Sequence, residues 1–204
     1  NVEDVDFNPD DFMARVNSDL VGKYINIASR TAGFIAKYFN GEILQSEQNN
    51  QSMMAAIVVF GSEELVASCY DERDYSKAVR EIMRVTDYVN EYVNNKAPWV
   101  LAKNVAQHKH GSELHAICSD ALKAFRALTI YLTPILPNLS KEVAMFFGDT
   151  EFFQDTQMYS WSDIQFAAER IPKIASYSHL INRIDAKQIE AMTEANKENL
   201  QSTQ

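Results

Sequence analysis

A long run of regularly spaced apolar side chains is the feature that most constrains the fold of this chain. Between Met13 and Tyr38 a side chain suited to a buried face recurs every three or four positions. This spacing is typical of one face of an α-helix with 3.6 residues per turn. Asn8 is suited to begin such a helix and Gly41 to end it. The pattern therefore predicts one helix of about 30 residues, or about 45 Å.

Further helices are expected along the rest of the chain, because only 6 glycines and 5 prolines interrupt its 204 residues. Ser112 and Asp185 are the N-caps expected for two of them. No alternation of strand and helix patterns and no internal repeat is visible. The sequence thus predicts an all-α helical bundle. Its expected later helices are 51–70, 74–95, 99–103, 113–132, 138–147 and 186–200, with a polar loop at 42–50 and an extended segment over the bundle at 149–185.

Charge and cysteine content limit the classes of function. The net charge is −9, from 19 basic and 28 acidic residues. A protein that binds nucleic acid by bulk phosphate neutralisation is usually basic, so any RNA binding must rest on a local patch. The two cysteines, Cys69 and Cys118, do not make a disulfide framework, and no apolar run approaches the length of a membrane span. We therefore expect a cytoplasmic protein.

A polar stripe accompanies the apolar face of the first predicted helix. Lys23, Asn26, Arg30, Gly33 and Lys37 follow one another at spacings of 3, 4, 3 and 4, which places them within about 80° of the helix circumference. The stripe can be the solvated edge of an amphipathic helix. It can also be a cationic surface whose Asn and Arg side chains pair with the edges of bases. The spacing alone leaves both interpretations open.

Trp99 follows Pro98 at a predicted turn between helices. Such a tryptophan is either a cap over the core or an exposed platform on which an unpaired RNA base stacks. A zinc site formed by His108, His110, His115 and Cys118 is a weak alternative, because the usual paired spacing of ligands is absent. No phosphate-binding glycine loop and no nucleophile elbow occur, so we expect no catalytic residues, metal or cofactor in this chain.

Several stretches, taken in order, resemble the anticodon-binding domain of bacterial-type methionyl-tRNA synthetases, which are class I aminoacyl-tRNA synthetases. The most specific are Asn26-Ile27-Ala28-Ser29-Arg30 and Lys96-Ala97-Pro98-Trp99. The resemblance covers about residues 11–195, and its other parts are 12–23, 32–34, 77–83, 100–103, 131–137 and 182–185. Residues 42–72 and 149–178 match the family poorly.

The resemblance implies a function and a site. Members of this family read the CAU anticodon of methionine tRNA, so the expected partner is the anticodon loop of that tRNA. Trp99, preceded by Pro98, would stack on an anticodon base, while Asn26 and Arg30 would bond to base edges. Lys23, Lys37 and Lys103 are additional candidates for contacts to RNA.

The resemblance also sets expectations for the domain. Residues 1–204 would be a single helical domain, with residues 1–8 as the linker from a catalytic domain that this sequence lacks. That catalytic domain would be the second partner, and ATP and in some relatives zinc would belong to it rather than to this chain. The chief alternative is a helical protein–protein interaction module that binds no RNA. An all-α enzyme of another kind is a third possibility.

Overall fold

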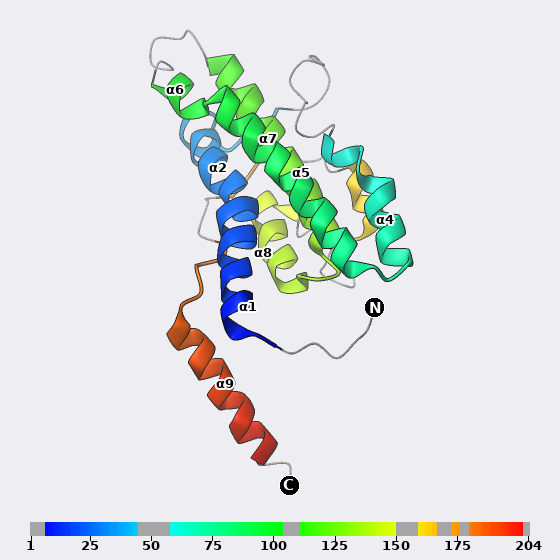
Figure 1. Cartoon of the computed structure of the whole chain (residues 1–204). Helices are drawn as coiled ribbons and strands as arrows, with labels where there is room; N and C mark the ends of the chain where they lie inside the picture. Colours follow the sequence, from blue (N-terminus) through cyan, green and yellow to red (C-terminus); the bar gives the residue numbers. More distant parts are fainter. Residues whose placement is uncertain are drawn as a thin grey trace.

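The structure, a computed structural model, describes residues 7–44, 58–103, 111–149, 159–166, 173–175 and 180–201, without the side chains of residues 165–166 and 197–201. Within these ranges the regular elements are helices, so the predicted all-α fold is confirmed (Figure 1). In chain order they are α1 (Pro9–Arg15), the π-helix η1 (Val16–Ile25), α2 (Asn26–Tyr38), α4 (Glu63–Asp71), α5 (Tyr75–Lys96), α6 (Pro98–Ala102), α7 (Gly111–Leu132), α8 (Pro137–Phe147), the 3-10 helix η4 (Trp161–Phe166) and α9 (Ala186–Gln201).

The first predicted helix is present as one continuous helical path through α1, η1 and α2. The Asn8 side chain accepts hydrogen bonds from the backbone N–H groups of Asp10 (3.0 Å) and Asp11 (3.2 Å), as an N-cap should. The backbone stays right-handed and helical at the junction residues Arg15 and Ile25. The middle third has the wider π pattern, which is rare at such length. Apolar spacing did not distinguish this pattern from an α-helix.

The end of this helical path is fixed by a glycine that the structure requires. Asn40 and Gly41 both have positive φ angles, of 53° and 78°. A Cβ on Gly41 would lie 2.9 Å from the carbonyl oxygen of Ile174. The Gly41 carbonyl also accepts a hydrogen bond from the Ile174 N–H (2.8 Å), so the later segment closes against this turn.

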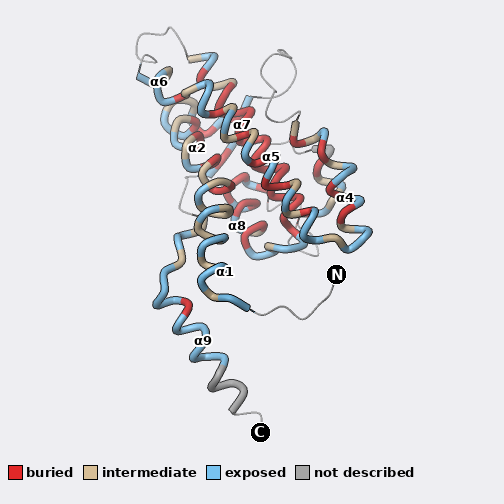
Figure 2. The backbone as a smooth tube through the Cα atoms, in the orientation of Figure 1, coloured by how far each residue is buried: buried red, intermediate tan, exposed pale blue. Residues whose placement is uncertain are grey.

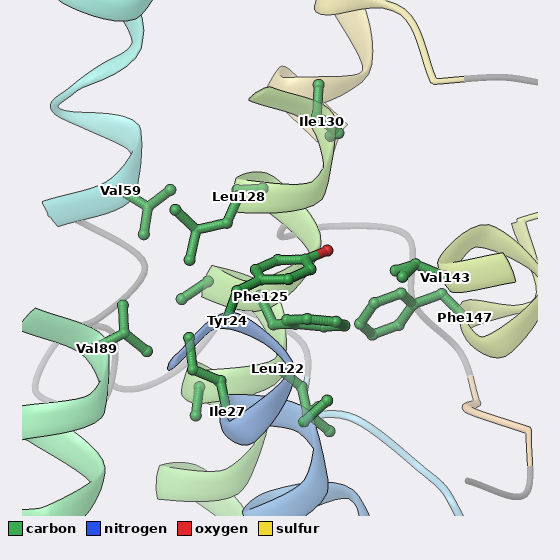
Figure 3. Close-up of a cluster of buried hydrophobic side chains, with 14 of the residues drawn as sticks. Tyr24, Ile27, Val59, Val89, Leu122, Phe125, Leu128, Ile130, Val143 and Phe147 are labelled. Carbon is green, nitrogen blue, oxygen red and sulfur yellow. The ribbon is translucent and has the colours of Figure 1, made fainter. Parts of the chain in front are cut away.

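The core is organised around α7, which is buried along almost its whole length (Figure 2). Helices α2, α5, α6 and α8 and the 3-10 helix η4 pack against it. At its middle, the rings of Phe125 and Tyr24 lie 4.7 Å apart between centroids, and Phe147 of α8 joins them (Figure 3). The buried Tyr24 hydroxyl is hydrogen-bonded to the Thr129 hydroxyl at 2.5 Å. This packing holds the first helix at a fixed angle to α7.

Two expectations from the sequence need correction. Ser112 is not an N-cap, because α7 already begins at Gly111. The segment 149–185 is not extended throughout: its described part includes η4, and Tyr159 is buried. Trp161 stacks on Tyr131 of α7 at 5.2 Å, so these aromatic side chains complete the core instead of lying exposed above it. Residues 1–6 of the expected linker, 45–50 of the expected loop and 51–57 of the second predicted helix lie outside the described residues.

The last helix extends away from the bundle and touches it through α1 (Figure 1). Asp185 and Gln188 cap it reciprocally, each side chain accepting a hydrogen bond of 3.0 Å from the other residue's backbone N–H. The Asn17 side chain bonds to both backbone groups of Ile184, at 2.8 Å each, and so ties the start of α9 to η1. Within the described part of the chain, no helix is both long and apolar enough to cross a membrane.

Candidate functional site

Side-chain pairs join the first helix to α5 along the predicted polar stripe. Each pair links residues 64 positions apart: Lys23 with Asp87 (2.9 Å), Asn26 with Asn90 (3.3 Å) and Arg30 with Asn94 (2.6 Å). A constant offset means that the two helices run in the same direction and stay in register over these turns. The stripe is therefore not a purely solvated edge: each of these three side chains has a partner on α5.

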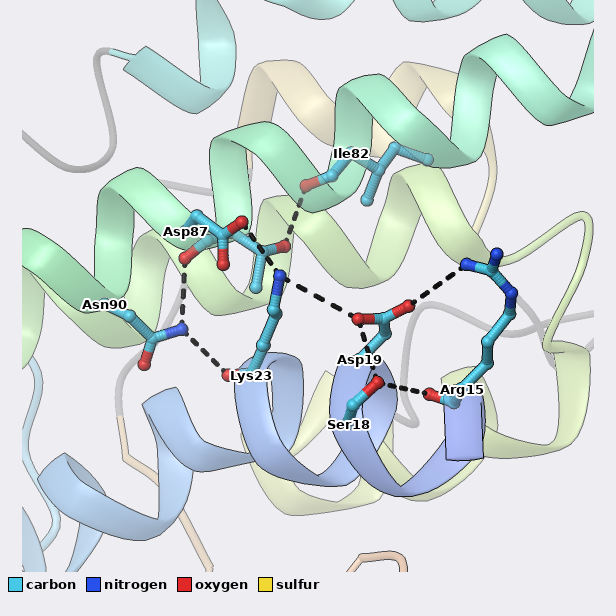
Figure 4. A network of polar contacts seen from close by, with 8 residues as sticks. Arg15, Ser18, Asp19, Lys23, Ile82, Asp87 and Asn90 are labelled. Carbon is cyan, nitrogen blue, oxygen red and sulfur yellow. Dashed lines mark hydrogen bonds and ion pairs between the residues drawn. The ribbon is translucent and has the colours of Figure 1, made fainter. Parts of the chain in front are cut away.

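Asn90 lies in the middle of this ladder, the row of three side-chain pairs that joins the first helix to α5. Its side-chain amide donates to the backbone carbonyls of Lys23 (3.0 Å) and of Thr86 (3.1 Å) (Figure 4). Its side-chain oxygen accepts a hydrogen bond from Asn26. An amide that both donates and accepts can satisfy both helices in this way. The Asn26 side chain is thereby held at a half-buried position on the surface of the two helices.

Arg30 lies against Trp99. Its guanidinium carbon is 4.6 Å from the centre of the indole ring, and its Nη2 donates to the Asn94 side-chain oxygen. Partial burial lowers the pKa of Arg30, but an arginine stays charged at any ordinary pH. Its hydrogen-bond partner is a neutral amide, so no carboxylate cancels the charge in this contact. The Trp99 side chain keeps 37% of its surface exposed, whereas Pro98 is buried.

The turn between α5 and α6 is what brings Trp99 to this place. Ala97, before the proline, takes the left-handed conformation with φ 44° and ψ 57°. A following proline disfavours the right-handed helical conformation, so the chain must leave α5 here. Pro98 then opens α6, and the Val100 N–H bonds back to the Ala97 carbonyl at 2.8 Å. The change of direction presents Trp99 beside Arg30 of α2.

The three lysines proposed as additional contacts differ in their surroundings. Lys23 is tied to two carboxylates, Asp87 at 2.9 Å and Asp19 at 3.8 Å (Figure 4). The hydrogen bond to Asp87 is the main cause that raises the pKa of Lys23. The Lys37 ammonium lies 4.9 Å from the centre of the Tyr38 ring, and Lys103 is exposed at the end of α6. Of these three lysines, Lys23 is thus the one whose charge is already neutralised by carboxylates of the protein.

The two segments that carry Arg30 and Trp99 have a charge opposite to that of the whole chain. Residues 26–41 and 93–103 together contain four cations, Arg30, Lys37, Lys96 and Lys103, and no aspartate or glutamate. The chain as a whole carries a net charge of −9. This local patch, hereafter the cationic end, is the arrangement that an acidic protein needs if it is to attract an anionic partner at one place.

The α5 side of the ladder was missed by the sequence analysis. Asp87, Asn90 and Asn94 are spaced 3 and 4 apart, which repeats the spacing of Lys23, Asn26 and Arg30. Two matching polar stripes on two predicted helices were the available signal. Spacing along one helix cannot say which other helix lies beside it.

The alternative zinc site gains no support from the residues that can be placed. His115 stacks on Phe39 at 4.0 Å and bonds to the Glu42 carbonyl, and Cys118 is buried in the core. Among the side chains of the described ranges, no group of three or more metal-ligating residues comes together. His108 and His110 lie outside the described residues.

The chain is similar in sequence to methionine–tRNA ligases along almost its whole length. It is 47% identical to the protein named methionine–tRNA ligase in Thiobacillus denitrificans, over 99% of this chain and 27% of that protein. It is 46% identical to the ligase of Azoarcus sp., over 98% of this chain and 26% of that protein. No protein-family model matches the chain.

A solved structure shares the fold. The crystal structure of the free form of Mycobacterium tuberculosis methionyl-tRNA synthetase superposes with a TM-score of 0.72, over 88% of this chain and 35% of that one, at 17% sequence identity. The chain thus shares the helical fold of part of that structure. In sequence it is homologous to one segment of the proteins named methionine–tRNA ligase, and it spans about a quarter of the length of the relatives it matches.

Proposed function

We propose that this chain is the anticodon-binding domain of a methionine–tRNA ligase, and that its cationic end binds the CAU anticodon loop of methionine tRNA. The observation that carries the proposal is Trp99, a partly exposed indole beside an arginine whose charge its hydrogen-bond partner does not cancel. An aromatic face and a cation together suit unstacked bases on an anionic strand. The homology to methionine–tRNA ligases supports this partner and does not favour a protein-interaction module.

The geometry suggests how each side chain would act. A base can stack on the open part of the Trp99 ring, which the Arg30 guanidinium covers from one side. The planar guanidinium and the Asn26 amide can each form paired hydrogen bonds to the edges of neighbouring bases. Asn90 and Asn94 would hold these two side chains in place before the RNA arrives, so less ordering would be needed on binding.

The chain would supply recognition, and the chemistry would belong to the rest of the ligase. ATP binding, methionine activation and any zinc would then lie in the catalytic domain. We expect the chain alone to show no methionine-dependent exchange of pyrophosphate into ATP, and a full-length ligase that carries it to show this exchange. Exchange by the chain alone would contradict this division. A cytoplasmic location follows from the same proposal.

The direct test is a titration with a short CAU anticodon stem-loop, beside one with a changed anticodon. Trp161→Phe leaves Trp99 as the only indole, so its fluorescence reports the site. We expect quenching by the CAU loop alone. Trp99→Ala removes this indole, so its binding is followed by the fluorescence anisotropy of a dye-labelled stem-loop. It should weaken binding about 5- to 150-fold, which corresponds to about 1–3 kcal/mol for one stacking side chain. Circular dichroism should remain that of the folded chain.

Arg30→Lys is the matched control for charge. It keeps the cation but loses the planar fork, so it should bind the CAU loop almost as poorly as Arg30→Ala. If the fluorescence of the chain alone does not change with added stem-loop, the same titration with the full-length ligase decides whether the proposed site binds the anticodon. Equal binding of both loops by the full-length protein, unaffected by Arg30→Ala, would contradict the proposed site.

A further inference from the structure

Gly33 lies in the middle of α2, and nothing in the described part of the chain explains it. Its φ angle is not positive, so its backbone conformation is open to any residue. A Cβ built on it would meet no atom within 4 Å. Glycine is among the least favourable residues inside a helix, because it loses the most conformational freedom on folding. An alanine at this position would fit and would stabilise the helix.

The other helix-interior glycine for which the space around a Cβ is known, Gly22, is different. A Cβ there would lie 3.1 Å from the carbonyl oxygen of Asn17, within the π segment. Gly41 and Gly148 have positive φ angles that favour glycine. For these three the reason lies within the fold. For Gly33 we look for it outside the chain.

The position of Gly33 indicates what approaches it. It is three residues after Arg30 and four before Lys37, so the three share one face of α2. That face belongs to the cationic end, which carries no carboxylate between residues 26 and 41. Gly33 is exposed there. A missing side chain between two cations leaves room for an anionic chain to come close to the helix backbone.

We infer that Gly33 is where the ribose–phosphate backbone of the bound RNA loop comes closest to α2, with Arg30 and Lys37 on either side of it. The inference rests on the proposed function and adds a residue to its site. Arg30 would face a base while Lys37 would face a phosphate, and a Cβ at Gly33 would push the strand away from both. Gly33 would thus set how near the strand can lie.

The test separates stability from binding. Gly33→Ala should raise the melting temperature of the chain by about 1–4 °C, because it removes the helix penalty of glycine. The same change should weaken binding of the CAU stem-loop, and Gly33→Leu should weaken it more, by about 5- to 150-fold. A variant that is more stable and binds worse cannot be explained by loss of folding.

The matched control is Ala191→Leu, which adds bulk to an exposed position of α9, a helix that extends away from the bundle, and should leave binding unchanged. The salt dependence of RNA binding tests whether the contact at Gly33 is to a phosphate. Gly33→Leu should reduce the slope of log K against log salt by about 1, the value expected for one lost phosphate contact. An unchanged slope would overturn the assignment to the RNA backbone.

The other outcomes distinguish failure of the proposed function from failure of the inference about Gly33. Binding is measured both with the chain and with a full-length ligase that carries it. If neither wild-type protein prefers the CAU loop, the proposed function fails. If they prefer it and Gly33→Leu binds equally well, only the inference about Gly33 fails. It also fails if Ala191→Leu loses as much affinity as Gly33→Leu, or if Gly33→Ala lowers the melting temperature.

Discussion

Two arginines in different regions of the molecule are held in contrasting ways. Arg126, in the middle of α7, is 3% exposed, and its Nε donates to the Asp149 carboxylate at 2.7 Å. The Tyr159 hydroxyl donates to the same carboxylate oxygen at 2.5 Å. Arg30, on α2, also has an aromatic ring beside it, but its hydrogen-bond partner Asn94 carries no charge. Figure 2 shows the difference in burial between α7 and the outer helices.

The comparison teaches how one chain can use the same side chain for two purposes. A buried guanidinium needs an opposite charge, because an unpaired charge in the interior is very costly. A guanidinium at the surface can be held by a neutral amide and a ring, which fix its direction and leave its charge for an outside partner. The core region satisfies its charge internally, and the cationic end does not.

The sharpest way to break this comparison is to neutralise the partner of the buried arginine. Asp149→Asn leaves Arg126 buried beside a neutral group, and should lower the free energy of unfolding by about 3–5 kcal/mol. Urea unfolding measures this. The double variant with Arg126→Met should recover much of the loss, because it removes the uncompensated charge. A loss below about 1 kcal/mol for Asp149→Asn would show that the pair is not what holds this region.

Alkaline unfolding tests the core region in a second way. Burial raises the pKa of Cys118 to about 12. Above about pH 9 the unfolded chain therefore releases a thiol proton that the folded chain retains, so stability falls as pH rises. The slope from this one group should approach about 1.4 kcal/mol per pH unit, which adds up to about 2.5 kcal/mol between pH 9 and 11.

The control for alkaline unfolding is Cys118→Ala, compared by its slope with pH and not by its absolute stability. The variant should have a shallower slope. It should keep some pH dependence, because burial also raises the pKa of Tyr70 to about 12. Identical slopes in the two proteins would contradict a buried, protonated thiol.

Asn94→Ala is the counterpart of Asp149→Asn at the cationic end. It removes the partner of Arg30, but this guanidinium is only partly buried and can turn to water. The free energy of unfolding should therefore fall by only about 0.5–1.5 kcal/mol, the usual cost of one hydrogen bond. Urea unfolding of both variants under one condition gives the comparison. Equal losses would mean that the two arginines are held alike.

The smallest effect is expected for the ion pair of Lys23 and Asp87, whose side chains are 37% and 54% exposed. Such surface pairs contribute about 0.2–1 kcal/mol, and salt screens them. A double-mutant cycle with Lys23→Ala and Asp87→Ala measures the coupling energy directly. It should shrink at high salt. A coupling that is larger and independent of salt would show that the ladder is part of the core.

Local signals predicted the starts and ends of several elements, although not the start of α7, and could not predict which elements meet. Asn8, Asp74 and Asp185 cap helices because their short side chains reach the first free N–H groups. Neighbours in sequence decide such contacts. The π pattern of η1 leaves the same apolar spacing as an α-helix, so it went unpredicted.

Contacts between residues far apart in the sequence account for the features of the structure that local signals did not predict. Tyr159 and Trp161 belong to the segment predicted to extend over the bundle, yet they pack on α7 through Arg126 and Tyr131. At the candidate site, the resemblance supplied Asn26, Arg30 and Trp99. Their partners on α5 depend on the register of two helices 64 residues apart, which no local pattern encodes.

The parallel course of α2 and α5 has an electrostatic consequence. Each helix ends with its negative dipole pole, and in a parallel pair both poles point the same way. Lys37 and Lys96 stand in the last turns of these two helices. Part of their charge is therefore used to offset the poles before any anion arrives. The field that an anionic strand meets at this end is weaker than four cations suggest, so orientation of a few side chains, more than attraction, should decide what binds.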